Sequence, residues 1–140
     1  MFQLHPQLEA DSHYVTDLPL CQVRLENVRN FPWLILIPKQ TNLTEVHQLL
    51  ATQQAQLILE SSLCAQALQS CFAIDKINVG ALGNVVPQLH WHVVGRRTKD
   101  DAWPRPVWGV ADTDPYTPCE LEMLISQLYQ AIEAVAQTAT

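Results

Sequence analysis

The sequence lacks the features of a membrane-spanning or secreted protein. It has no apolar run near the roughly 18 to 20 residues that cross a bilayer. Its first residues show neither the basic region nor the long apolar region of a signal peptide. Its four cysteines form no C-x-x-C pair, and isolated thiols suit a reducing compartment. We therefore expect a cytoplasmic protein with no membrane partner, in which the cysteines are small apolar core residues.

Charge is scarce as well, because charged residues make up 16% of the chain and apolar residues 48%. This balance is typical of a compact globular protein, and 140 residues is an ordinary length for one domain. The net charge of −6 argues against a nucleic-acid partner. Repeats, low-complexity tracts and linkers are all missing, so we expect a single domain over residues 1–140.

Basic residues are concentrated in one part of this acidic chain. Five of the eight fall between positions 76 and 105, where only two aspartates oppose them: Lys76, Arg96, Arg97, Lys99 and Arg105 against Asp100 and Asp101. A local positive patch of this kind suggests a small anionic ligand. The alternative is that Lys99 and the two aspartates form a solvated turn.

The spacing of apolar residues predicts alternating strands and helices. Residues 21–27 and 33–39 read as two strands, and the turn residues between them predict an antiparallel pair. From 42 to 71 the spacing changes to three, four and seven, which predicts one long amphipathic helix capped by Asn42. Residues 76–80 and 88–96 predict two further strands.

A helix start signal stands near the end of the chain. Thr117 fits the N-cap, Pro118 the first helical position, and Glu120 the closing residue of a capping box. The predicted order is therefore strand, strand, helix, strand, strand, helix. Because most connections are hairpin-like, we predict an α+β fold with helices packed on an antiparallel sheet.

The stretch QLHWHVV (88–94) places polar and apolar residues on alternate positions of a predicted strand. Side chains alternate between the two faces of a strand, so Gln88, His90 and His92 share one face. Three interpretations compete for this row. It is a solvated polar face, a metal site, or a catalytic site in which an imidazole acts as nucleophile and proton carrier. A closed zinc site needs further ligands, and no other histidine has motif spacing to this pair.

The stretch resembles the signature of the histidine triad (HIT) superfamily, His-φ-His-φ-His-φ-φ with φ apolar. It matches from Leu89 to Val94 and departs at Gln88, where the family has its first histidine. Upstream, NVG (78–80) and GN (83–84) resemble the family's Asn/Gln-Gly and Gly-Gln elements, and downstream GRRTKDDAWPRP resembles a Gly-Arg…Trp-Pro-Pro tail. The resemblance covers residues 15–110. It implies a HIT-like sheet of about five strands with a long helix packed on it and a C-terminal helix.

The resemblance also implies a function and a set of roles. HIT enzymes act on nucleotide conjugates, such as phosphoramidates or dinucleoside polyphosphates, through a covalent nucleotidyl-histidine. That nucleophile would be His90, and His92 would contact the phosphate or the leaving group. Hydrogen bonds to ribose or phosphate would come from the neighbouring residues: Asn78, Asn84 and Asn27 through their amides, and Gly80 and Gly83 through backbone N–H groups. No metal or cofactor is required, and HIT proteins are often homodimers.

Two departures from the family pattern leave a second function open. An amide cannot carry a proton as an imidazole does, so Gln88 either orients a neighbour or slows turnover. Val85 stands where some members have Ser or Thr aimed at the leaving group. The alternative is therefore a nucleotide-binding module with little turnover. If the first position is mainly structural, Gln88→His should keep or raise the rate. Trp103 and Trp108 either form a wall beside the nucleotide or anchor their loop on the core.

Overall fold

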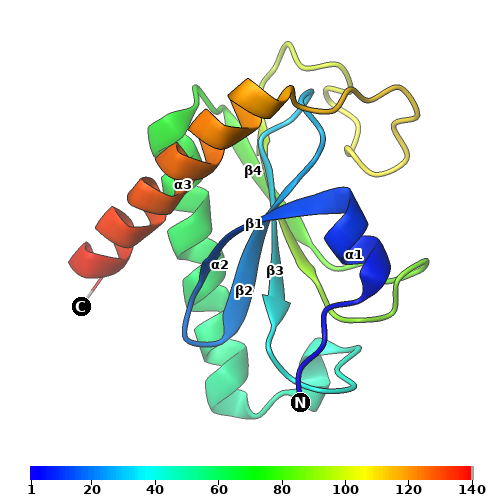
Figure 1. The fold of residues 1–140 in the computed structure, drawn as a ribbon, viewed down its shortest axis with the longest axis vertical. Helices are drawn as coiled ribbons and strands as arrows, with labels where there is room; N and C mark the ends of the chain where they lie inside the picture. The colour runs from blue at the N-terminus through cyan, green and yellow to red at the C-terminus, as the bar shows by residue number, and fades with distance from the viewer. Residues whose placement is uncertain (140) are drawn as a thin grey trace.

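A computed structural model describes residues 1–139. The chain forms a five-stranded sheet with a short helix and two long helices (Figure 1). The elements follow one another along the chain as α1 (Pro6–Asp11), β1 (Ser12–Asp17), β2 (Cys21–Glu26), β3 (Trp33–Pro38), the 3₁₀ turn η1 (Val46–Gln48), α2 (Ala51–Cys71), β4 (Lys76–Gly80), β5 (Trp91–Arg96) and α3 (Pro118–Thr138). The predicted α+β class with an antiparallel sheet of about five strands is confirmed.

The sheet has the strand order β1-β2-β3-β5-β4, and every neighbouring pair is antiparallel. The predicted pairing of the second and third strands is confirmed, since Cys21 lies opposite Pro38 and Leu25 opposite Leu34. β5 lies between β3 and β4, so that His92 pairs with Ile35 on one side and with Gly80 on the other. The histidine strand is therefore an interior strand, held in register on both sides.

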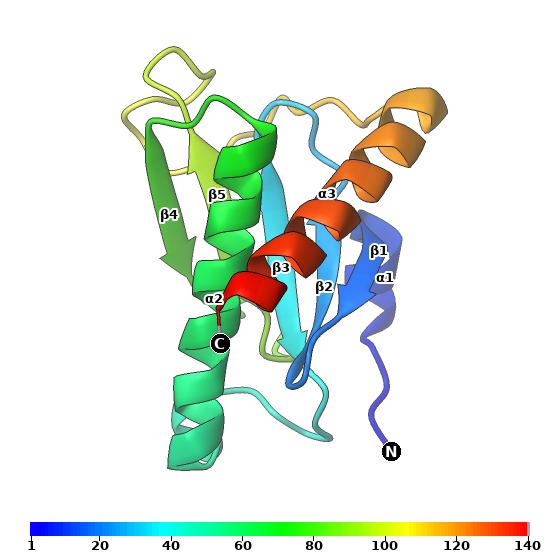
Figure 2. The same ribbon diagram turned by 90° about the vertical axis from the view of Figure 1, so that its left-hand side faces the viewer.

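The two faces of the sheet are covered differently. Figure 2 shows α2 and α3 crossing the same face, while α1 lies on the far side. The helix-covered face is aliphatic, with buried residues such as Val23, Leu36 and Val93 against Leu57 and Leu128. We call the other face the open face. It carries a second, smaller core that includes Leu8 of α1, Trp33, Ile35, Val94 and Val107.

Two sequence predictions about the elements need correction. The predicted helix from 42 to 71 begins only at Ala51, because Asn42 is in the left-handed region (φ 57°) and cannot start a helix. The segment before it forms η1, where Glu45 and Gln48 make the capping box. α1 and β1 were not predicted. β1 carries an irregularity between Tyr14 and Thr16, which breaks the alternation that marks a strand.

The predicted start of α3 is confirmed. The Thr117 hydroxyl accepts a hydrogen bond from the Glu120 N–H at 3.2 Å and donates to the Glu120 carboxylate at 3.0 Å. The Glu120 carboxylate therefore accepts from the Thr117 hydroxyl, whereas in a capping box it would accept from the Thr117 backbone N–H. None of the helices within residues 1–139 combines the length and apolar character needed to cross a membrane.

Candidate active site

The alternation predicted for residues 88–94 is present in the structure. Leu89 and Val93 are buried in the helix-side core, and the Trp91 indole donates to the Ser61 hydroxyl of α2 at 2.9 Å. His90 and His92 point to the open face. The strand itself begins at Trp91, so the first of the two histidines lies just before it. The histidines are thus held on an interior part of the sheet by apolar residues that face the other way.

His90 is fixed by the backbone beside it. Its Nδ1 lies 2.7 Å from the carbonyl oxygen of Gln88. A carbonyl only accepts, so Nδ1 carries a proton, and in the neutral ring it is Nε2 that has the lone pair. His90 is 9% exposed and lines a cavity of about 460 Å³ between η1 with the residues before it and the connection from β4 to β5. His90 therefore lies at a cavity wall with its Nδ1 held by the backbone.

His92 is held by a tryptophan from the neighbouring strand. The Trp33 indole N–H donates to Nδ1 of His92 at 2.9 Å. An indole only donates, so the proton of His92 is on Nε2, which is free to donate to a ligand. Burial, and next the closeness of His90, lower the pKa of His92 to about 3. His92 is therefore a neutral hydrogen-bond donor at physiological pH and not a cation.

Aromatic rings enclose the two imidazoles. The His90 and His92 rings lie 4.8 Å apart between centroids, and Trp108 meets His92 edge-on at 5.4 Å. Trp108 also meets Trp33 at 6.3 Å, which closes the cluster. The Trp108 Nε1 atom is buried and has no hydrogen-bond partner among residues 1–139. Trp108 thus both anchors its loop and forms a wall beside His92.

Gln88 shares the row with the histidines but does not bond to their rings through its side chain. Its Oε1 accepts from the backbone N–H of His5 at 2.8 Å, and its Nε2 donates to the carbonyl of Gln3 at 2.9 Å. The side chain at the first triad position is therefore engaged with the N-terminal segment, while its backbone carbonyl serves His90.

Asn78 lies on β4 opposite Val94 of the histidine strand, and a buried ion pair sets the direction of its amide. Its Oδ1 accepts from the Arg96 guanidinium at 2.9 Å, which leaves the amide N–H₂ as its free end. Arg96 bonds Asp100 twice, at 2.8 and 3.0 Å, and both side chains are 1% exposed. The Arg96 guanidinium also lies over the Trp103 ring.

The expectation of a positive patch for an anion is not supported at Arg96, because Asp100 neutralises its charge. The solvated-turn alternative is wrong for Asp100, because its side chain is buried and bonded to Arg96. Burial raises the pKa of the Asp100 carboxyl, but hydrogen bonds from Arg96 and from backbone N–H groups outweigh it and lower the pKa to about 2. The Asp100 carboxylate therefore stays charged beside Arg96. The pair holds in place the loop that carries Trp108.

Three other predicted residues lie in or beside the β4–β5 connection. Gly80 is paired with His92 across β4 and β5. Gly83 has a φ of +72°, a backbone conformation that residues other than glycine rarely adopt. Both glycines line the cavity beside His90. Asn84 is exposed, and within residues 1–139 its side chain makes no hydrogen bond. The predicted glycine positions are therefore at the site, while Asn84 is at its outer edge.

Asn27 is not brought to the histidines by any interaction that the structure shows within residues 1–139. It follows β2, its backbone N–H donates to Asp11, and its Oδ1 accepts from the Tyr116 N–H at 3.0 Å. Its amide links the end of β2 to the segment before α3. The structure therefore gives Asn27 a structural role, apart from the predicted contact with a nucleotide.

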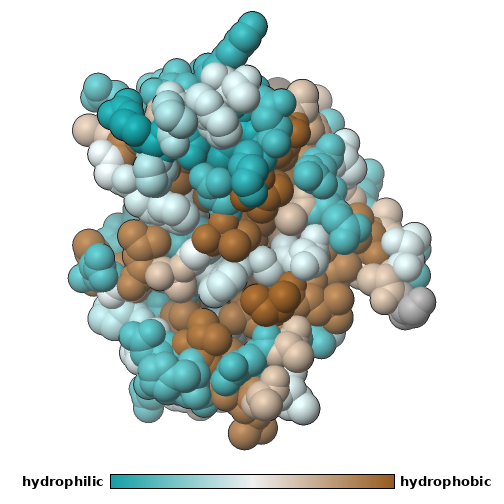
Figure 3. All heavy atoms as spheres, turned by 180° about the vertical axis from the view of Figure 1, so that it is seen from behind, coloured by the Kyte–Doolittle hydropathy of each residue, from teal (hydrophilic) through white to brown (hydrophobic). Residues whose placement is uncertain are grey.

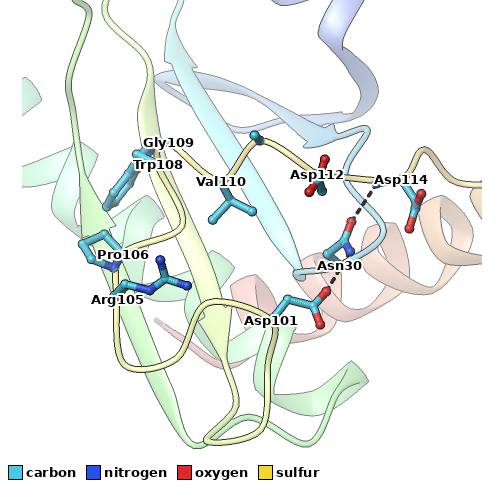
Figure 4. A pocket seen from close by; sticks show the side chains of 10 residues that line it. Asn30, Asp101, Arg105, Pro106, Trp108, Gly109, Val110, Asp112 and Asp114 are labelled. Atoms are coloured by element: carbon cyan, nitrogen blue, oxygen red, sulfur yellow. Dashed lines mark hydrogen bonds between the residues drawn. The ribbon is translucent and has the colours of Figure 1, made fainter.

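A second and larger cavity of about 750 Å³ lies on the open face beyond Trp108 (Figure 4). The β2–β3 turn and the loop after β5 form its walls, and Asn30 ties the two together through Asp101 and the Asp114 N–H, each at 2.8 Å. Its charged residues are Arg105 and three aspartates. His90 lines the smaller cavity and not this one, and His92 lines neither, so the position of His90 favours the smaller cavity as the place of reaction.

The metal interpretation finds no support in the side chains. Within residues 1–139, no three His, Cys, Asp or Glu side chains form a group that could hold a metal ion. The Nδ1 atoms of both histidines are also already engaged. Each imidazole of the pair is held by a hydrogen bond at Nδ1.

Two residues of the open face were not predicted. Trp33 determines the tautomer of His92, but the two residues are 59 positions apart and no local pattern joins them. Glu26 ends β2 on the same face. Burial, and then the nearby Asp11, raise its pKa to about 7 against the opposing effect of Arg24. A half-buried carboxyl that titrates near neutral pH is a candidate functional group.

A scan for protein families matches residues 7–99 to the HIT domain. The chain belongs to the histidine triad family. It superposes on a histidine triad protein from Bradyrhizobium japonicum with a TM-score of 0.90 and 44% identity, covering 94% of this chain and 98% of that one. A histidine triad protein from Marinobacter aquaeolei VT8 gives 0.92 and 41%, covering 96% and 98%.

More distant HIT structures share the fold. A protein from Sulfolobus tokodaii strain7, described as a hypothetical histidine triad nucleotide-binding protein, has a TM-score of 0.70 at 15% identity and covers 95% of this chain and 90% of its own. No curated protein gives a significant sequence match. The family model and these structures together show the family and its fold.

Proposed function

We propose that this HIT protein is a nucleotide hydrolase or nucleotidyl transferase that acts through His90. Nε2 of His90 attacks the α-phosphorus of a nucleotide conjugate, so that an N–P bond forms as the bond to the leaving group breaks, and the leaving group takes up a proton from solvent. Water then attacks the phosphorus and releases one proton to solvent, the N–P bond breaks, and a nucleoside monophosphate leaves. His90 returns as a neutral imidazole with its Nδ1 proton in place.

The observation that carries this proposal is the 2.7 Å contact between His90 Nδ1 and the Gln88 carbonyl. It fixes the tautomer in which Nε2 is unprotonated, and it stabilises the positive charge that grows on the ring during attack. A metal or a general base is then not needed to prepare the nucleophile. His90 also lines a cavity of about 460 Å³, large enough for the reacting part of a conjugate.

Neutral donors around His90 support charge development on the phosphate. Within residues 1–139, Nε2–H of His92 and the amide N–H₂ of Asn78 make no hydrogen bond, because Trp33 and Arg96 occupy the other ends of these side chains. Preorganised donors in a water-poor site lower the barrier by stabilising charge where it develops. His92 with a pKa of about 3 donates a hydrogen bond without carrying a charge of its own.

The charge of the cavity favours a phosphoramidate over a dinucleoside polyphosphate. Among residues 1–139, no lysine or arginine lines the cavity beside His90, and its one carboxylate belongs to Glu45. A polyphosphate leaving group would bring several negative charges to a cavity without a cation. An amine leaving group is neutral or cationic and suits Glu45. Incubation with an adenosine phosphoramidate and with a dinucleoside polyphosphate compares the two, and we expect faster turnover of the phosphoramidate.

The proposal is tested with His90→Ala and a matched histidine control. We expect His90→Ala to lower the hydrolysis rate of the phosphoramidate on the order of 10³-fold or more, because the nucleophile is removed. His13→Ala is the control, since His13 lies on β1 at the far edge of the sheet and lines neither cavity. Mass spectrometry of acid-quenched wild-type protein should show a nucleotidyl adduct on His90. Equal rates in wild type and His90→Ala would overturn the proposal.

A nucleotide-binding module with little turnover is the second candidate. It is favoured by the engagement of Gln88 with the N-terminal segment, which leaves no proton carrier at the first triad position. Val85 adds to this, because it is 90% exposed and offers no hydroxyl to a leaving group. Calorimetric binding of a nucleoside monophosphate to wild-type protein, together with no measurable turnover of either conjugate, would favour the module.

The expected homodimer stays a proposal. β4 is an edge strand, and its Val79 is 49% exposed. Leu82, in the connection that follows, is 47% exposed. Figure 3 shows apolar surface in the middle of the side opposite to that of Figure 1, between two polar zones. An exposed strand edge with apolar side chains suits a second copy of the chain. Sedimentation equilibrium of wild type and Val79→Lys measures this, and we expect the variant to dissociate.

A further inference from the structure

The side chain of Gln88 binds the N-terminal segment at two points. Its Oε1 accepts from the His5 N–H at 2.8 Å and its Nε2 donates to the Gln3 carbonyl at 2.9 Å. One carboxamide thus satisfies a donor and an acceptor two residues apart on an extended chain, as a neighbouring strand would. The bonds join residues 83 and 85 positions apart in sequence, so they hold the segment to the body of the protein.

The segment held in this way is packed on the open face. Phe2 and Leu4 pack against the smaller core, which includes Trp33 and Val94 of the strands that carry the site. His5 then caps α1, because its Nδ1 accepts from the Gln7 N–H at 3.0 Å. Residues 1–5 therefore form a docked strap that leads into α1, and Gln88 is its attachment point beside the histidines.

The same residue supports His90 through its backbone. The Gln88 carbonyl lies 2.7 Å from His90 Nδ1, two residues along the chain. Side-chain bonds to the strap and the main-chain bond to His90 are thus made by one residue. Rotation of the peptide after Gln88 would break the bond to His90, and the two anchored side-chain bonds resist that rotation. Residues 88–90 precede β5, and the Leu89 N–H of the same peptide donates to the Leu43 carbonyl at 2.9 Å, so the two side-chain bonds act together with one backbone bond.

A carboxamide fits this position better than an imidazole. It presents a permanent acceptor and a permanent donor on adjacent atoms, at all pH values near neutrality. An imidazole presents one of each only as a neutral ring in one tautomer, with the two nitrogens on different sides of the ring. We propose that Gln88 is a positioning residue, which clasps residues 1–5 and thereby holds its own carbonyl on His90 Nδ1. This rests on the proposed function of His90, and it reverses the expectation that Gln88→His keeps or raises the rate.

The test uses three substitutions of Gln88 and one control in the full-length protein. Gln88→Met keeps the length and removes both bonds, Gln88→Glu keeps the acceptor and loses the donor, and Gln88→His introduces the family residue. Gln69→Met is the control, because Gln69 is exposed on α2. We expect kcat for the phosphoramidate to fall about 10- to 100-fold in Gln88→Met with KM within about twofold, because a misplaced nucleophile slows the chemical step. Gln88→Glu should lie between wild type and Gln88→Met, and Gln88→His should also lose rate.

Two measurements without substrate decide the inference independently of turnover. Nitrogen-15 NMR reports the tautomer of His90, and we expect Gln88→Met to change it from Nδ1–H alone to a mixture. Hydrogen exchange reports the His5 N–H, which should exchange faster in Gln88→Met than in Gln69→Met. If Gln88→Met keeps the His90 tautomer and the protection of His5, the inference is wrong. If wild type has no turnover while both spectroscopic changes occur, the clasp stands and the proposed function fails.

Discussion

The two faces of the sheet use their polar groups in opposite ways. On the helix-covered face the buried carboxylate of Glu60 accepts from the Leu20 and Cys21 N–H groups, each at 2.8 Å, and from the Gln56 amide at 2.7 Å. Both of its oxygens accept bonds that serve the fold. On the open face His90 and His92 each have one nitrogen held by the protein and one left free. Buried polar groups occur on both faces. What distinguishes the candidate site is that its polar side chains are held at one atom and keep a second atom available for a ligand.

Removing the buried cation of the open face should have the largest effect on stability. Arg96→Met leaves Asp100 buried without its partner and frees the Oδ1 of Asn78. We expect the free energy of unfolding to fall by about 3–5 kcal/mol, the usual loss when one member of a buried pair is removed. Urea unfolding measures it. Arg105→Met is the control on an exposed arginine, and an equal loss there would show that the buried pair is not the cause.

His92 should make the stability of the open face depend on pH. Its pKa is about 3 in the folded protein against 6.5 for an ordinary histidine. Between these values the unfolded chain binds a proton that the folded chain does not, so stability is lost as the pH falls from 6.5 toward 3. By pH 4 this contribution is about 3 kcal/mol.

His92→Gln is the matched variant, because the Gln oxygen can still accept from Trp33. We expect its stability to fall less than that of wild type between pH 7 and pH 4, as measured by urea unfolding at both values. Parallel losses in the two proteins would mean that the pKa of His92 is not lowered by burial. The same variant should keep nucleotide affinity better than it keeps rate, because the free Nε2–H is proposed to act on developing charge.

The helix-covered face offers the comparison on the other side. Glu60→Gln replaces one carboxylate oxygen by an N–H₂ that faces a backbone donor, at Leu20 or at Cys21. We expect the free energy of unfolding to fall by about 1–3 kcal/mol, the penalty of one unpaired buried donor. The rate of each folded molecule should not change, since Glu60 touches no residue of the site. Glu122→Gln on the exposed side of α3 is the control, and a loss of rate in Glu60→Gln would contradict the separation of the two faces.

The parts of the fold that depend on neighbouring residues were predictable from the sequence. Alternation around His90 and His92 showed which residues face the core, and the signal at Thr117 located the start of α3. The predicted start of α2 at residue 42 was wrong. Val46 and Leu50 continue the helical spacing, but Asn42 adopts a left-handed conformation and the helix begins at Ala51. Spacing reports which face a residue takes and not whether the backbone is helical.

The contacts that complete the site could not be read from local patterns. Trp33 meets His92 across 59 positions, and Gln88 meets His5 across 83. Such pairs depend on which strands lie side by side, and β5 enters between β3 and β4 out of chain order. The family resemblance supplied the expected role of His90, whereas the Nδ1 partners of both histidines followed only from the structure.

Glu26 poses the sharpest question about the open face. Its folded pKa of about 7 lies above the ordinary 4.5, so the folded chain holds a proton between these values that the unfolded chain releases. Its contribution to stability is full below pH 4.5 and is lost as the pH rises through 7. Glu26→Gln should therefore equal wild type near pH 5 and be more stable at pH 8. Urea unfolding at both pH values measures this, with Glu122→Gln as control.

The rate of the same variant separates two meanings of the raised pKa. If burial of Glu26 is only a by-product of packing α1 on the sheet, Glu26→Gln gains stability at pH 8 and keeps its rate. If the carboxyl serves the reaction, the variant gains stability and loses rate, since functional groups are often held at a cost to the fold. We expect the second result, because Glu26 lies on the face where the other anchored polar groups keep free ends. A gain of stability with an unchanged rate would mean that Glu26 takes no part in the reaction, and that the site consists of the histidines and the tryptophans that contact them.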